Sequence, residues 1–378
     1  APGEYFDRGR VRFLEHNVYA AFPEHVEMLY LAGIVLSGGR DGGTSAAVLI
    51  QALFGLLSAV TVGLLAGRAI GKKAALPAAV FFLSCPVLVV TVTRAHISLA
   101  RCFYVAAALF AVLEWTGRSA GLDGERRDRP DRWMILAGLS CGCAVAVKYP
   151  EILLLCIPLG LFVLATGMLV RKNWRRRLTP AVLLTLCTLI FAGPWLVRNY
   201  IHTGNPFFPL LYDLFGGGGW PAPQAAKFAR AHATPPLGSA GELLRELWRF
   251  AVGHTDAMSP GFAGPLVLVF IPFLMVRGKG SGDGGKDRIF PLAFLGGYVL
   301  VAGLLWALAT HRIDRFLVPV LGPLAVISAA GFVALLPKRG TWTLAVAAAS
   351  VLLLCTFWMQ VFRAESTGGL GGTLAGKN

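Results

Sequence analysis

The stretch SAAVLIQALFGLLSAVTVGLLAGRA, residues 45–69, decides the fold class. Its single charged residue, Arg68, lies next to its end. A helix rises 1.5 Å per residue, so a run of about 20 apolar residues crosses a hydrocarbon core about 30 Å thick. The stretch therefore predicts a membrane-spanning helix.

The composition extends this prediction to the whole chain. Of the 378 residues, 56% are hydrophobic and only 15% are charged, and the mean hydropathy is +0.64. A soluble domain carries about 25% charged residues. The composition excludes a disordered protein, a coiled coil and an ordinary cytosolic enzyme. It predicts an all-α integral membrane protein forming one polytopic domain, residues 1–378.

Ten apolar runs predict about ten transmembrane helices. They cover residues 45–69, 73–92, 97–115, 133–149, 150–170, 178–197, 262–276, 289–310, 315–336 and 341–361. The shorter run 26–36 predicts an interfacial helix on the outer leaflet. The alternative, a short spanning helix, would invert every later loop. Seven cysteines lie in or beside apolar runs without zinc spacing, which is typical of small packing residues.

Basic residues set the predicted orientation. The chain has 35 Lys and Arg against 20 Asp and Glu, a formal charge of +15. Every second loop collects the excess: 68–73, 118–132, 171–177, 277–288 and 338–339. By the positive-inside rule these loops face the cytoplasm, which explains the charge without nucleic-acid binding. Residues 1–44 and the long loop 198–261 then face outward.

Ionisable residues also lie at the outward ends of the apolar runs, where topology does not explain them. Charge at a membrane boundary is costly, so these residues are functional candidates. The cations Arg94, Lys148, Arg312 and Arg315 suit a phosphate, and the carboxylates Glu24 and Glu27 suit a metal or a general base. Snorkelling at the interface explains a single Arg or Lys. Several such segments on one side predict an outward cavity of mixed charge.

The outer loop 198–261 has two notable segments. Residues 193–210, GPWLVRNYIHTGNPFFPL, are rich in Pro, Gly and aromatic side chains, which predicts a rigid turn at the membrane surface. An aromatic-belt anchor is the alternative. Residues 242–252 have apolar side chains at helical spacing, which favours a helix lying on the membrane surface.

Four segments resemble the bacterial GT-C glycosyltransferases, the superfamily of the dolichyl-phosphate-mannose-protein mannosyltransferases and the aminoarabinose transferases. They are FPEHVEMLYLAG at 22–33, LAGLSCGCAVAVKYPEILLL at 136–155, PWLVRNYIHTGNPFFPLLYDLFGG at 194–217 and HRIDRFLVPVLGPLAVISA at 311–329. The resemblance covers essentially the whole chain, and the last two segments are the most specific.

The resemblance implies an inverting membrane enzyme in a bacterial inner membrane. Such an enzyme moves a sugar from a polyprenyl-phosphate carrier to a protein, lipid or glycan acceptor at the outer face. It implies that Lys148, Arg312 and Arg315, with Arg198 and Arg94 behind them, hold the lipid phosphate. It also implies acid–base or metal roles for Glu24 and Glu27, with His25, His96 and His311 as further ligands of a Mg, Mn or Zn ion.

The chain departs from the family pattern in two places. The family's key acidic residue follows its first membrane helix, and we expect that helix and catalytic loop to lie upstream of Ala1. The turn before residue 97 usually offers a carboxylate, but here it reads Arg94-Ala95-His96-Ile97-Ser98, so His96 is the candidate for that role. A transporter or lipid-carrier flippase and a non-catalytic scaffold are the alternatives. We find no internal repeat, and the charges lie at helix ends, which favours the transferase.

Overall fold

The computed structural model describes residues 1–93, 96–119, 131–170, 174–252, 264, 267–274 and 289–335, and within these ranges the chain is helical without a strand. The α-helices of the first half are α1 (Pro2–Asp7), α2 (His25–Leu36), α3 (Arg40–Ala69), α4 (Ala75–Leu83), α5 (Pro86–Thr93), α6 (Ser98–Ser119) and α7 (Asp131–Val147). Those of the second half are α8 (Ile157–Val170), α9 (Trp174–Thr203), α10 (Tyr212–Phe215), α11 (Ala222–Ala231), α12 (Ala240–Val252), α13 (Ile289–Ala309) and α14 (Leu321–Leu335). Short 3-10 turns are η1 (Val18–Ala21), η2 (Lys72–Ala74), η7 (Asp314–Phe316) and η8 (Val318–Val320), and a π-helical turn, η3 (Ile152–Cys156), precedes α8.

Six helices in the described ranges are long and apolar enough to cross a membrane: Arg40–Ala69, Ser98–Gly117, Ile152–Leu169, Leu178–Thr203, Ile289–Ala309 and Val318–Leu335. They coincide with six of the ten predicted runs. The run 133–149 forms the shorter apolar helix α7. The run 341–361 and most of 262–276 lie outside the described residues, so the total of ten stays a prediction.

The predicted span 73–92 is divided in the structure into α4 and α5. The break falls at Ser84 and Cys85, directly before Pro86. Proline has no N–H for the helical ladder, and its ring disfavours the helical conformation in the residue before it. The Ser84 hydroxyl donates to the Phe81 carbonyl at 2.7 Å and completes the end of α4. Neither half is long enough to span a bilayer alone.

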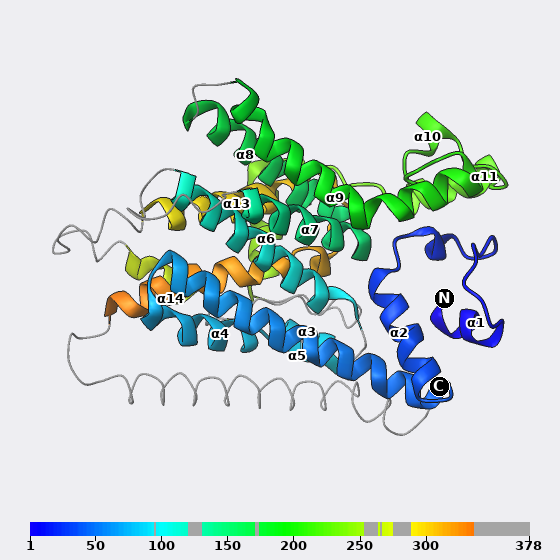
Figure 1. Ribbon diagram of the computed structural model, residues 1–378, viewed down its shortest axis with the longest axis horizontal. Helices are drawn as coiled ribbons and strands as arrows, with labels where there is room; N and C mark the ends of the chain where they lie inside the picture. Colours follow the sequence, from blue (N-terminus) through cyan, green and yellow to red (C-terminus); the bar gives the residue numbers. More distant parts are fainter. Residues whose placement is uncertain are drawn as a thin grey trace.

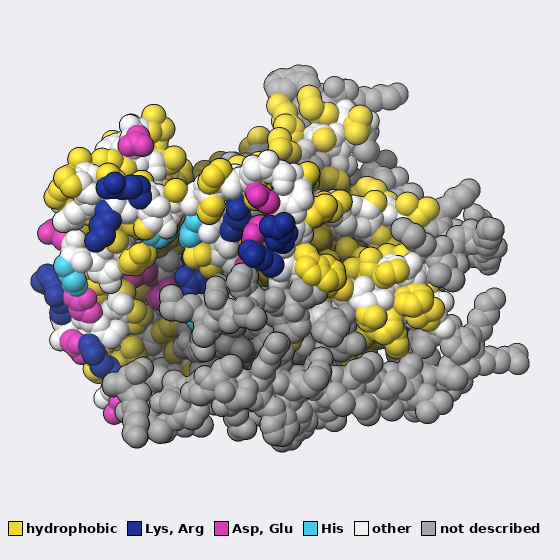
Figure 2. Space-filling model, turned by 180° about the vertical axis from the view of Figure 1, so that it is seen from behind, with side chains coloured by type: hydrophobic (Ala, Val, Ile, Leu, Met, Phe, Trp, Pro, Cys, Tyr) yellow, Lys and Arg dark blue, Asp and Glu magenta, His cyan; other side chains and the backbone are white. Residues whose placement is uncertain are grey.

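The helices form an elongated bundle with a polar end. Figure 1 shows α3, α9 and α14 running along its long axis, and α1, α2, α10 and α11 gathered at one end. Figure 2 shows acidic, basic and histidine side chains gathered toward that same end, whereas much of the remaining described surface is apolar. The predicted interfacial helix 26–36 is α2, at this polar end.

One face of α3 shows what surrounds the bundle. Its exposed large side chains include Leu49, Leu53, Leu56, Val60 and Leu64, which are three or four residues apart. This spacing places them along one side of the helix. The described helices leave this stripe exposed, and an apolar stripe of this length is stable in contact with lipid tails. The opposite face packs on α4 and α6.

The close approach of α7 and α9 depends on two glycines. A Cβ at Gly142 would lie 2.4 Å from the Thr188 carbonyl oxygen, and one at Gly138 would lie 2.6 Å from that of Leu184. Small residues four apart let membrane helices pack backbone to backbone, which matters because lipid tails give helices no hydrophobic reason to associate. This contact fixes the end of α7, after which Lys148 follows.

Candidate functional site

Three turns meet at the polar end around the ring of Phe316, a buried residue of η7. The Lys148 Nζ atom, just after α7, lies 4.8 Å from the ring centroid. The guanidinium carbon of Arg101, from the first turn of α6, lies 5.8 Å from it. The His311 ring packs edge-on at 5.1 Å. An aromatic face attracts cations, so Phe316 holds Lys148 and Arg101 near one another.

Arg101 and Glu151 form a buried ion pair beneath this ring. The side chains of both are 1% exposed. The Arg101 Nε atom donates to Glu151 Oε1 at 2.6 Å, and its two terminal nitrogens donate to the carbonyls of Arg315 and Phe316, each at 2.9 Å. The guanidinium therefore directs its hydrogen bonds to groups within the protein and holds the backbone of η7.

Lys148 and Arg315 are the two cations of this site whose side-chain nitrogens make no hydrogen bond or ion pair within the described ranges. Arg315 is exposed, and Lys148 is half-buried. Burial lowers the pKa of Lys148 to about 7, and the positive charges of Arg101 and Arg315 act in the same direction. An anion arriving between these cations would restore the full charge of Lys148.

Glu27, on the first turn of α2, is one of two carboxylates, with Glu151, that act electrostatically on Lys148. Its Oε2 atom is buried and has no hydrogen-bond partner in the structure as described. Burial raises the pKa of Glu27 to about 7, the neighbouring Glu24 adds to that rise, and Lys148 opposes it. A carboxyl and an amine that both titrate near neutral pH are suited to proton transfer.

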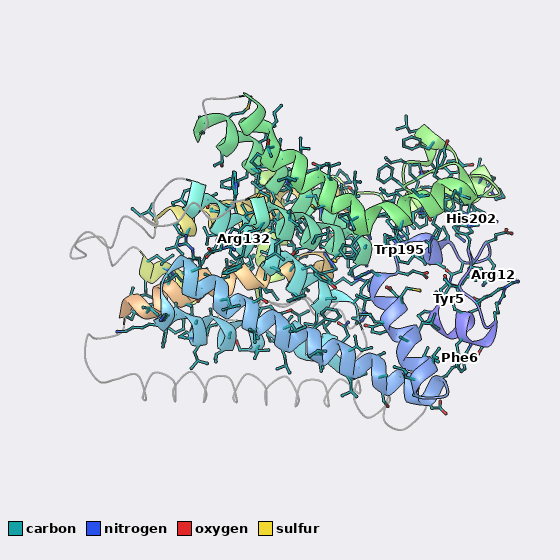
Figure 3. All side chains as sticks on the ribbon, viewed as in Figure 1. Tyr5, Phe6, Arg12, Arg132, Trp195 and His202 are labelled. Atoms are coloured by element: carbon teal, nitrogen blue, oxygen red, sulfur yellow. The ribbon has the colours of Figure 1, made fainter. Side chains whose placement is uncertain are left out.

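Glu24 and Arg198, two further predicted site residues, are engaged in a clasp that holds the N-terminal segment. Glu24 Oε2 accepts from the Tyr5 hydroxyl at 2.8 Å and from Arg198 Nη1 at 3.3 Å. Arg198 Nη2 donates to the carbonyls of residues 20, 21 and 22 at 2.8–3.2 Å. Trp195 stacks beneath the guanidinium at 4.7 Å, and Figure 3 shows it on α9 beside the N-terminal segment. Through these contacts, Glu24 and Arg198 hold the N-terminal segment, residues 1–24, against α9.

Arg312, the fourth predicted phosphate residue, also makes hydrogen bonds within the protein. Its Nε donates to the Ala307 carbonyl at 2.9 Å, and its Nη2 donates to the Pro235 carbonyl. Its backbone takes a positive φ of 51°, and its N–H donates to Thr310 Oγ1 at 3.2 Å. Arg312 thus ties the segment around Pro235 to the end of α13. Arg94, the fifth predicted phosphate residue, lies outside the described residues.

The predicted metal residues are not assembled into a metal site. Across the described ranges, no three His, Cys, Asp or Glu side chains group closely enough to hold an ion. His25 Nε2 lies 3.4 Å from the Tyr104 hydroxyl, and burial lowers its pKa. Burial, together with His232 and Lys148, lowers the pKa of His311 to about 4. His96 is half-buried just ahead of α6.

The sequence prediction missed Arg101, although a signal was available. Arg101 lies inside the predicted span 97–115, and an ionisable residue within a membrane helix is by itself a functional or structural marker. Its partners could not be read from the sequence because they lie 50, 214 and 215 residues away.

An apolar groove of about 470 Å³ opens between α8 and α13. Its walls include Leu161 and Phe162 from α8 and Phe290, Phe294 and Tyr298 from α13. Tyr298 has Glu151 and Arg101 as electrostatic neighbours. Tyr298 thus lies both in the wall of the groove and within electrostatic range of the buried ion pair.

Comparisons with known proteins give a family match over part of the chain and a shared fold. Residues 29–197, under half of the chain, match the family model described as dolichyl-phosphate-mannose-protein mannosyltransferase. No curated protein gives a significant match. The crystal structure of ArnT from Cupriavidus metallidurans bound to undecaprenyl phosphate is similar, with a TM-score of 0.53 and 18% identity over 94% of this chain and 57% of that one. The chain thus spans a little over half of the length of ArnT, and the likeness shows a shared membrane fold. The apo oligosaccharyltransferase of Archaeoglobus fulgidus is similar at a TM-score of 0.47, with 14% identity over 92% of this chain and 48% of that one.

Proposed function

We infer that the chain belongs to the GT-C superfamily of membrane glycosyltransferases, and we propose that it moves a sugar from a polyprenyl-phosphate donor to an acceptor. The observation that carries the proposal is the placement of Lys148 over the Phe316 ring and within electrostatic range of both the Arg315 cation and the buried carboxyl of Glu27. The family match over residues 29–197 supports the same reaction class.

Lys148 and Arg315 suit the leaving group of this reaction. When the bond between the sugar and the lipid phosphate breaks, negative charge grows on the phosphate oxygens. Cations already in place stabilise that charge without reorganisation. Each well-placed donor lowers the activation free energy by about 3–4 kcal/mol. Because neither side chain makes a hydrogen bond or an ion pair within the described ranges, both can donate to the phosphate.

The groove between α8 and α13 suits the isoprenoid tail. Its walls are aromatic and aliphatic, and its position next to Tyr298 brings a bound chain toward the Arg101–Glu151 pair. A lipid can enter it sideways from the bilayer, because both helices are of membrane-spanning length. The phosphate then stops where the cations begin, at the polar end of the bundle.

Glu27 is suited to act as the general base. In its charged form it accepts the proton of an acceptor hydroxyl, and the acceptor oxygen attacks the anomeric carbon. The carbon–oxygen bond to the lipid phosphate breaks as the new one forms, so the sugar is inverted and the polyprenyl phosphate leaves with the electron pair. A base with a pKa near the working pH performs this transfer best. Glu27, at about 7, meets that requirement.

A divalent metal enters no step of this mechanism. The described residues do not fit a metal site, because His25, Glu27 and His311 are not brought together. Lys148 and Arg315 supply positive charge to the leaving group in its place. The positive-inside rule supports an outward-facing site in a bacterial inner membrane, with the acceptor arriving beneath the loop that contains α11 and α12.

A transfer assay tests the proposal. The full-length protein, reconstituted in vesicles, is given polyprenyl-phosphate-linked labelled sugars together with cell-envelope acceptors. We expect label to leave the lipid, and we expect Lys148→Met or Arg315→Gln to slow the reaction about 100-fold or more. Lys73→Met, an exposed lysine near the far end of α3, is the matched control. Equal activity in all four proteins would refute the assigned site, and transport of intact donor without transfer would favour a flippase.

A further inference from the structure

The buried Arg101–Glu151 pair ties together the two turns that carry the proposed phosphate ligands. On one side, Arg101 donates to the carbonyls of Arg315 and Phe316, at 2.9 Å each. On the other, the Glu151 N–H donates to the Lys148 carbonyl at 3.2 Å, so the turn that begins at Lys148 ends on the partner of Arg101. The backbone of each cation is therefore one hydrogen bond from the same ion pair.

The pair has a shape that a simple charge would not provide. One planar guanidinium serves a carboxylate and two carbonyls in different directions, which needs the rigid fork of arginine rather than a lysine ammonium. This arrangement also sets the position of the Phe316 ring. Arg101 holds the backbone carbonyl of Phe316, and the face of the ring contacts Lys148 Nζ.

Stability alone is a poor reason for keeping such a pair. Moving two charges out of water costs several kcal/mol each, and apolar side chains of similar volume often replace a buried pair without loss of stability. The side chains of Arg101 and Glu151 are each 1% exposed, so this cost applies in full. The contacts of the pair go to the two turns of the site, which is where a positional benefit would arise.

We propose that the Arg101–Glu151 pair is a positioning device that sets the separation of Lys148 and Arg315 at the donor phosphate. The inference rests on the proposed function of these two cations. The pair links the turn after α7 to η7 by hydrogen bonds, in addition to the contact of Lys148 with the Phe316 ring. A displacement of about 1 Å in a catalytic group can reduce a rate about 100-fold.

The test replaces the pair by apolar side chains, Arg101→Met/Glu151→Leu, in the full-length protein. Binding of farnesyl phosphate in detergent is measured by calorimetry, and donor turnover is measured in vesicles. We expect the variant to fold with an unchanged melting temperature, to bind farnesyl phosphate at least about tenfold more weakly and to lose about 100-fold in kcat/KM. Arg101→Lys keeps the charge but not the fork, and we expect an intermediate loss.

Two controls separate positioning from general damage. Arg68→Met/Glu114→Leu removes another ion pair, with Nε and Oε1 at 2.8 Å, which joins α3 and α6 far from the site, and it should leave binding unchanged. Lys148→Met is then added to the Arg101→Met/Glu151→Leu protein. If the pair acts through Lys148, the second change should weaken binding much less there than in the wild type, because coupled groups are not additive.

The outcomes are distinguishable. Additive effects of Lys148→Met, or unchanged binding in the apolar double variant, would overturn the positioning role while leaving the proposed function standing. A wild-type protein that neither binds farnesyl phosphate nor turns over donor would overturn the proposed function and this inference with it. If the double variant fails to fold, the cycle between Arg101→Lys and Lys148→Met decides in its place.

Discussion

Removing the guanidinium of Arg198 should release the N-terminal segment of the chain. Arg198→Met loses the hydrogen bonds to the carbonyls of residues 20–22 and leaves the Glu24 carboxylate, 4% exposed, with the Tyr5 hydroxyl as its remaining partner. Removing one partner of a buried ion pair costs about 3–5 kcal/mol. Because the Arg198 side chain is 18% exposed, we take the lower end, about 3 kcal/mol.

Hydrogen exchange measures this cost directly. If opening of residues 1–24 becomes easier by about 3 kcal/mol, their amides exchange about 100-fold faster, since 1.4 kcal/mol corresponds to a factor of ten. The effect should shrink at pH 5. Burial already raises the pKa of Glu24, and without Arg198 the carboxyl takes up a proton more readily and leaves no buried charge. Arg230→Met removes an exposed arginine on α11 and is the matched control.

The alternative role for Arg198, binding of lipid phosphate, predicts the opposite pattern. In that case Arg198→Met would weaken binding of polyprenyl phosphate and leave exchange of residues 1–24 at the wild-type rate. That result would refute the assignment of Arg198 to the clasp.

Four further predictions concern the rate and the stability near neutral pH, the helix packing and the loop after α9. The pH profile of kcat/KM should be bell-shaped with its maximum near pH 7, because Glu27 must lose its proton and Lys148 must keep its own, and both pKa values are about 7; Glu27→Gln should remove the acidic limb. Over the same range these two groups should make the fold least stable near pH 7. Stability falls from pH 4.5 to 7 because the unfolded chain loses the Glu27 proton that the folded chain keeps, and it rises from pH 7 to 10.5 because the unfolded chain keeps the Lys148 proton that the folded chain has lost. Thermal unfolding at several pH values checks this. Gly142→Ala should destabilise the α7–α9 contact by about 1–3 kcal/mol, whereas Gly193→Ala, with nothing within 4 Å of the added carbon, should not; equal melting temperatures would contradict the close packing. Asn205→Ala should lower the stability of the folded loop 206–216 by about 1–3 kcal/mol, because the buried Asn205 amide donates to the carbonyls of Leu210 and Gly216. Proteolysis within 206–216 should then be faster than in the wild type, and wild-type resistance would contradict this prediction.

Hydropathy predicted the elements that depend on local composition. The runs 45–69, 97–115 and 289–310 are spanning-length helices because apolar length alone decides whether a segment can cross a bilayer. The break in 73–92 could have been predicted from Pro86, which lies inside the run. It was not predicted, because proline is also tolerated in membrane helices.

The site was predictable only in part, because its residue types are local and its partners are not. Lys148 was found since a cation at an outward helix end has no topological reason to be there. Arg198, Arg312 and Arg315 looked equivalent by the same reasoning. Their differences come from carbonyls of residues 20–22 and of Pro235, which no pattern around the arginines specifies. A side chain's remaining hydrogen-bonding capacity is a property of the fold.

The account depends most on the claim that Lys148 and Arg315 receive the phosphate of the lipid donor. A cryo-electron microscopy structure of the full-length protein in nanodiscs with polyprenyl phosphate tests it directly. We predict phosphate density within hydrogen-bond distance of Lys148 Nζ and the Arg315 guanidinium, with the isoprenoid chain between α8 and α13. Phosphate density at the guanidinium of Arg198 or Arg312, with Lys148 and Arg315 left in water, would contradict the account.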